Sequence, residues 1–152
     1  MSYQFSLEQL LQLRDREKDQ KVKSYNEAVD QFEQKAGALY EMLRSKEHAE
    51  EINREKMTRG VTVRELRQQE KMLHIYEREA AVLEEAVSKA RWMMQREEKA
   101  MQEAWRENRK LELIKEKEEA KHMEKLKRNE RMAMDDTAVQ MYLQKQTVQH
   151  YG

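Results

Sequence analysis

The sequence predicts an all-α fold, with two long helices in an antiparallel coiled-coil hairpin and a C-terminal helical overhang. Charged residues make up 39% of the 152 residues, and there are no prolines, no cysteines and only three glycines. This is more charge and fewer turn residues than an average globular domain has. Apolar residues recur three and four positions apart over long stretches, which is typical of helices that pack along a seam. Only the stretch from Arg59 to Leu66 stops one helix and starts another.

The chemistry of that stretch predicts a sharp reversal of the chain. Gly60 can adopt the left-handed conformation that closes a helix. Thr62 and Glu65 have the spacing of a capping box, and Val61 can pack on Leu66 as a hydrophobic staple at the start of the next helix. We therefore expect a first helix over residues 1–59, a turn over 60–63 and a second helix from residue 64.

Both expected helices carry a seam with the same phase. In the first helix the seam contains Val22, Tyr25, Val29, Phe32, Ala36, Leu39 and Leu43. In the second helix it contains Leu66, Gln69, Leu73, Tyr76, Ala80, Leu83, Val87, Ala90 and Met94. If the chain folds back at the turn, facing residues should have position numbers with a near-constant sum. Large residues then face small ones, as Leu43 faces Ala80, which favours this register. Two polar layers, Asn53 with Gln69 and Asp15 with Asn108, could fix the register.

Pairing should end where the first helix runs out, near Leu7 opposite Lys115. The paired part of the second helix is then 64–115, and residues 116–152 form an overhang without an intrachain partner. Apolar residues continue at helical spacing along it, which a solvated tail would not need. We expect this helix to be partly disordered in the isolated protein, because an unpaired helix is marginal in water.

A second apolar stripe lies beside the seam of the second helix. It contains Met72, Ile75, Val82, Ala86 and Met93. Two interpretations stay open: a slightly rotated seam covers part of the stripe, or the stripe is an exposed partner site. Trp92 favours the second, because it points away from the first helix and exposed tryptophans are enriched in binding hot spots.

Several classes of function have little support in the sequence. Basic and acidic residues number 30 each, and glutamates interrupt the basic stretch 109–131, so we expect no nucleic-acid partner. The four histidines are scattered, and Glu118 with His122 supplies only two metal ligands, so we expect no catalytic residue, metal or cofactor. No secretory signal or membrane span is apparent and cysteine is absent, which favours the cytoplasm.

Three short motifs stand near the two ends of the chain. Phe5 is followed by leucines and a charged run. The second helix contains the charged segment Lys110-Leu111-Glu112 with Lys115-Glu116-Lys117, and later the acidic pair Asp135-Asp136, followed by Ala138 and Tyr142. The opening, the charged segment and the late acidic pair resemble those of the flagellar FliJ family, and the resemblance spans nearly the whole chain.

The resemblance implies a non-enzymatic component of flagellar type III protein export, which acts as a chaperone and serves motility and chemotaxis. It implies an antiparallel coiled coil similar to the stalk of rotary ATPases. Its expected partners are the hexameric export ATPase, the export gate membrane protein and export substrate chaperones, at the cytoplasmic side of the inner membrane. Alone, the protein is expected to be monomeric. The alternative is a structural coiled-coil scaffold that forms homo-oligomers through the second stripe.

Two sets of residues are expected to make these contacts. The export gate face is expected to contain Met72, Ile75, Tyr76, Glu79, Val82, Leu83 and Trp92. The contact with the ATPase ring is expected to contain Leu7, Leu11, Met123, Leu126, Asp135 and Asp136.

Overall fold

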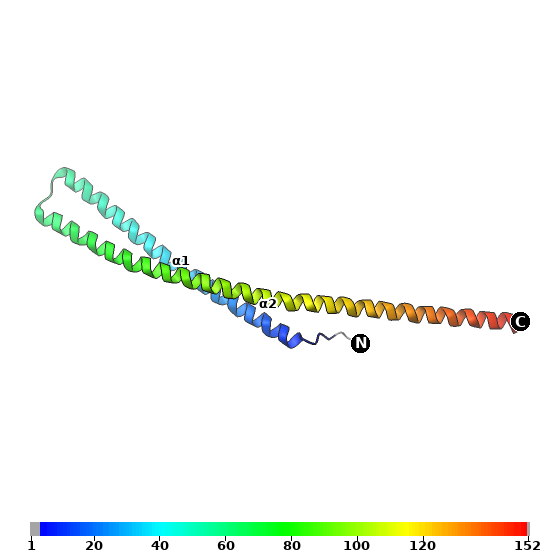
Figure 1. Ribbon diagram of the computed structural model, residues 1–152. Helices are drawn as coiled ribbons and strands as arrows, with labels where there is room; N and C mark the ends of the chain where they lie inside the picture. Colours follow the sequence, from blue (N-terminus) through cyan, green and yellow to red (C-terminus); the bar gives the residue numbers. More distant parts are fainter. Residues whose placement is uncertain (1–3, 152) are drawn as a thin grey trace. The chain divides into compact units, whose positions relative to one another are not determined.

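The computed structural model describes residues 4–151, and these form two α-helices with no strand in that range. Helix α1 is Glu8–Arg59 and helix α2 is Val63–Tyr151 (Figure 1). The predicted all-α fold is confirmed. The chain divides into two compact units. The hairpin unit is Arg16–Trp105, and the end unit combines the residues up to Asp15 with those from Arg106 onward.

The turn of the hairpin unit has the capping geometry that its sequence predicts. Gly60 has a φ of 93°, in the left-handed region that disfavours other residues, and its N–H donates to the carbonyl of Met57 at 3.4 Å. The N–H of Glu65 donates to Oγ1 of Thr62 at 3.3 Å, and the N–H of Thr62 donates to Oε2 of Glu65 at 3.4 Å. The capping box thus satisfies two amide groups that the start of α2 would leave unpaired.

The two helices of the hairpin unit pack in the predicted register. The contacts that cross between them include Lys46 to Glu77 at 3.9 Å, Lys18 over the Trp105 ring at 4.6 Å, and Arg91 over the Phe32 ring at 5.6 Å. The two position numbers of each contact have the same sum, as an antiparallel pair with one register requires. Ala80 and Val87 are buried, and most other seam residues are half-buried.

The seam is less well covered toward the turn. Leu43, Met57 and Leu66 are 43%, 54% and 36% exposed, although the sequence places all three in the seam. Ala80, which the sequence places opposite Leu43, is buried, and Met42 next to Leu43 is half-buried.

The end unit buries two side chains of very different chemistry. Phe5, which precedes α1, is 6% exposed, and Asn108 is 1% exposed with no hydrogen-bond partner for its Nδ2 within the described residues. Lys115 pairs with Glu8 at 2.9 Å, and the hydrogen bond with that carboxylate raises the pKa of Lys115 above its ordinary 10.5. Glu118 and His122 are half-buried, so coverage of α2 in this unit continues past Lys115.

Candidate partner-binding flank

One flank of the hairpin unit carries a row of hollows. Each hollow is lined by α2 residues that lie beside the seam. In order along α2 these are Glu65, Gln68 and Met72, then Glu79 and Val82, then Ala86, Lys89 and Met93. With Ile75 added, successive positions are three and four residues apart, so all of them lie on one side of the helix. We call this side of the hairpin unit the apolar flank.

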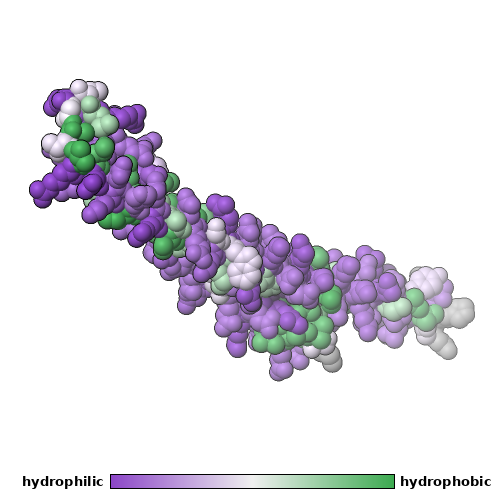
Figure 2. All heavy atoms as spheres, turned by 60° about the vertical axis from the view of Figure 1, so that its left-hand side comes forward, coloured by the Kyte–Doolittle hydropathy of each residue, from purple (hydrophilic) through white to green (hydrophobic). Residues whose placement is uncertain are grey.

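The second apolar stripe of the sequence lies on this flank and is mostly exposed. Met72, Ile75 and Met93 are 49%, 48% and 42% exposed, and Val82 is 68% exposed. Only Ala86 is half-buried. The rotated-seam interpretation therefore holds for Ala86, whereas the larger members of the stripe stay accessible. Figure 2 shows one face of the molecule, on which apolar groups surface among hydrophilic side chains, including at the end that carries the turn.

Helix α1 contributes apolar residues to the same flank. Ala49 and Ile52 line the hollow with Met72, and Met42 lines the hollow with Val82. The partner site predicted from the sequence did not include these α1 residues. Their spacing could have indicated them, because Met42 and Ala49 are seven residues apart and each directly precedes a seam position, so they form a stripe of their own.

The opposite flank has a different composition. On α2 it contains Arg67, Glu70, His74, Glu77, Glu84, Arg91 and Glu98, at the spacing expected beside the other edge of the seam. His74 and Lys46 both approach the carboxylate of Glu77 there, at 3.7 and 3.9 Å. On α2 the two flanks therefore differ, and the apolar flank is the one with large exposed aliphatic side chains that a protein partner could bury.

The structure separates the residues expected at the export gate face into three places. Met72, Ile75, Glu79 and Val82 lie together on the apolar flank. Tyr76 and Leu83 are half-buried members of the seam. Trp92 is 59% exposed, off the stripe, with the guanidinium of Arg96 5.5 Å from its ring centroid.

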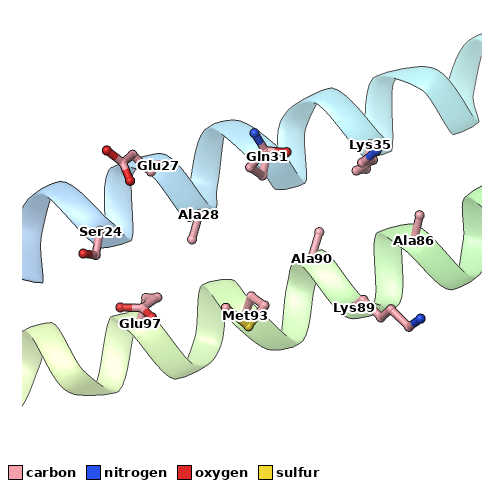
Figure 3. Close-up of a pocket in the computed structure, with 10 residues that line it drawn as sticks. All are labelled: Ser24, Glu27, Ala28, Gln31, Lys35, Ala86, Lys89, Ala90, Met93 and Glu97. Atoms are coloured by element: carbon pink, nitrogen blue, oxygen red, sulfur yellow. The ribbon is translucent and has the colours of Figure 1, made fainter.

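A further hollow of the flank lies between Ser24 and Lys35 on α1 and has a volume of about 680 Å³. Its lining contains small side chains from both helices, Ser24 and Ala28 on α1 and Ala86 and Ala90 on α2 (Figure 3). Met93 also lines it. Small residues at these positions leave space that larger ones would fill.

The residues expected at the ATPase ring lie in the end unit. Leu7 is 38% exposed and Leu11 is half-buried, whereas Met123 and Leu126 are 54% and 38% exposed. Asp135 and Asp136 are exposed. All side chains described from Met123 to Val148 are exposed, so this segment has no partner within the described residues.

The apolar residues of that segment occupy two opposite sides of α2. One stripe contains Met132, Val139 and Leu143, and the other contains Met134, Met141 and Val148. Members of each stripe are seven or four residues apart, whereas Met132 and Met134 are two apart and so point in opposite directions. All six are more than half exposed. A surface partner would cover one stripe and leave the other in water.

Within residues 4–151 we find no group of three or more side chains that could hold a metal ion. Over the same range, neither helix contains a stretch long and apolar enough to cross a bilayer.

The fold defines a class, the all-α proteins built as a hairpin of two long helices. Residues 3–147 of this chain match the sequence model of a protein family that is described as "Flagellar FliJ protein". The chain is also 29% identical over 143 residues to the flagellar FliJ protein of Bacillus subtilis (strain 168), covering 94% of this chain and 97% of that protein. No solved structure matches. The chain belongs to the flagellar FliJ family.

Proposed function

We propose that this protein is a non-enzymatic component of the flagellar protein export apparatus and acts as a stalk for the export ATPase. Membership of the flagellar FliJ family supports the flagellar role. The observation that carries the stalk role is the pair of opposite apolar stripes on the segment from Met123 to Val148. A helix with apolar residues on opposite sides is stable when protein surrounds it, and the inner wall of a ring of subunits would do so.

The apolar flank supports the second part of the proposal, contact with the export gate. Met72, Ile75, Glu79 and Val82 form one accessible patch, and a carboxylate beside exposed aliphatic side chains suits a specific protein contact better than non-specific aggregation. Binding of the gate would hold the protein at the cytoplasmic side of the inner membrane. Escort of substrate chaperones is the third activity we propose, on the family relationship.

Stimulation of ATP hydrolysis by the purified export ATPase tests the stalk role. The variant Met134→Glu with Met141→Glu puts two charges on one exposed stripe and should abolish stimulation, because a desolvated wall cannot accept unpaired carboxylates. The matched control, Gln140→Glu with Gln144→Glu, adds the same charge between the stripes and should keep most of the stimulation. Full stimulation by the methionine variant would exclude the stripe as the ring contact.

The exposure of the flank also favours a second candidate, a structural scaffold that assembles with itself. Sedimentation distinguishes the two. If the protein is a stalk, it should sediment as a monomer at micromolar concentration. If it is a scaffold, it should sediment as a dimer or a larger species, and the variant Met72→Gln with Ile75→Gln should be a monomer.

A further inference from the structure

The hollow between Ser24 and Lys35 lies on the apolar flank but away from the gate patch around Met72 and Ile75. Its lining contains no residue of that patch. We propose that it is a separate docking site for one amphipathic helix of a protein partner, with large apolar side chains facing the hollow and opposite charges at its two ends.

Charges are distributed along the hollow with a clear polarity. Glu27 and Glu97 lie toward one end, and Lys35 and Lys89 lie toward the other (Figure 3). Lys89 pairs at 3.6 Å with Glu85, an exposed neighbour on its own helix. No ion pair joins the acidic end to the basic end among the residues that the structure describes. An occupant with basic residues at one end and acidic residues at the other would complement both ends at once.

The dimensions of the hollow suit a single helix. From residue 24 to residue 35 of α1 the axial distance is roughly 16 Å, or about three helical turns. A helix laid along a groove in this way buries side chains at i, i+3, i+4 and i+7. The partial positive charge of its N-terminus favours the end with Glu27 and Glu97, so the docked helix should run parallel to α1.

The same flank of a second copy of this chain is a poor occupant, because that flank is hollow at the same place. Ala28, Ala86 and Ala90 of one copy would meet equally small side chains of the other, and the space would remain empty. A void between apolar walls forfeits the contacts that make association favourable. The occupant therefore has to present leucine-sized or larger side chains.

The test uses the full chain and a fluorescent helical peptide of about 18 residues, long enough to span the hollow. The peptide has leucine and methionine on one face, lysines in its first turn and glutamates in its last turn. Fluorescence anisotropy should show saturable binding. A peptide of the same charge pattern with alanine in place of the leucines should bind roughly tenfold more weakly or not at all, because it leaves the hollow unfilled.

Variants of the chain locate the site. Ala86→Gln fills the hollow and should weaken binding of the peptide roughly tenfold, whereas Ser88→Gln on the opposite flank should leave it unchanged. Lys35→Glu with Lys89→Glu should also weaken binding, and a peptide whose glutamates are replaced by lysine should restore it. Melting curves followed by circular dichroism confirm that each variant keeps the wild-type fold.

Absence of saturable binding to the wild-type chain at peptide concentrations up to millimolar would overturn the proposal, and so would equal binding by Ala86→Gln and Ser88→Gln. A dimer in sedimentation that Ala86→Gln dissociates would show that a second copy is the occupant instead. None of these results bears on the stalk role, because Ala86→Gln leaves the segment from Met123 to Val148 intact and stimulation of the ATPase reports that role independently.

Discussion

At the scale of single residues, the reversal depends on a few local hydrogen bonds around the turn. Thr62 and Thr58 are both exposed and only four positions apart, yet their hydroxyls do different things. Oγ1 of Thr62 accepts from the N–H of Glu65, whereas Oγ1 of Thr58 donates to the carbonyl of Glu55 at 2.6 Å, inside α1. The first bond satisfies an otherwise unpaired amide, and the second competes with helix geometry.

This difference gives a matched pair of substitutions. Thr62→Ala should lower the free energy of unfolding by about 1 kcal/mol, since it removes a cap. Thr58→Ala removes the same atoms without losing a cap and should change the stability by less than about 0.5 kcal/mol. Urea unfolding of both variants measures the difference, and equal losses would show that the hydroxyl of Thr62 does not cap α2.

The two glycines that the structure describes make opposite predictions. Gly60 has positive φ, so Gly60→Ala should destabilise the protein by about 1 kcal/mol, although no atom lies within 4 Å of the added Cβ. Gly37 lies inside α1, where the added Cβ also meets nothing within 4 Å, so Gly37→Ala should stabilise it by roughly 0.5–1 kcal/mol. Thermal unfolding reports both, and a shift of the same sign for the two variants would contradict this account.

At the scale of helices, the two flanks of the hairpin unit predict different mutational behaviour. Met72 and Ile75 are about half exposed and lie off the seam, so Met72→Gln with Ile75→Gln should leave helicity and melting nearly unchanged. Binding to the cytoplasmic part of the export gate should weaken at least roughly tenfold, as expected when apolar anchors of an interface are lost.

The control for this pair lies on the opposite flank. His74→Gln changes an exposed residue on the charged side of α2 and should leave binding to the gate unchanged. Calorimetric titration measures both affinities. A large drop in melting temperature for the methionine and isoleucine variant would instead place these residues in the packed seam, and an undiminished affinity would remove them from the gate contact.

The sequence predicts the helices and the register well, because both depend on the periodic spacing of apolar residues, which is visible in the sequence itself. The turn at Gly60 and Thr62 is local chemistry, and the seam follows from spacings of three and four. The burial of Phe5 does not follow in this way, since it precedes α1 and belongs to no period. The half-burial of Met42 next to Leu43 does not follow either, because the coverage of a side chain beside the seam depends on the side chains of the partner helix as well as on the period of its own helix.

The candidate site is harder to predict than the fold. The stripe from Met72 to Met93 is visible in the sequence, but its exposure depends on how far α1 covers it. The hollow lined by Ala28 and Ala90 requires small residues from both helices along the same stretch of the flank, which becomes apparent only once the register is known. Asn108, the most buried residue described, was predicted as one member of a polar layer, without the depth of its burial.

At the scale of the whole molecule, the proposed function separates the binding surfaces by partner. The hairpin unit offers a gate patch and a hollow on one flank, and the end unit offers a helix with two exposed stripes. The proposal requires that the ring of the export ATPase surrounds the segment from Met132 to Val148, because only an enclosing wall covers both stripes. Contact from one side alone would leave three large apolar residues in water.

Photo-crosslinking in motile cells tests this central claim most directly. A photoreactive amino acid at Val139 reports one stripe, and the same group at Met141 reports the opposite stripe. If the ring encloses this segment, both positions should give adducts with subunits of the export ATPase, whereas a probe at Ile75 on the apolar flank should give none with that protein. Adducts with the ATPase from only one of the two stripes, or from neither while Ile75 yields them, would contradict an enclosed stalk.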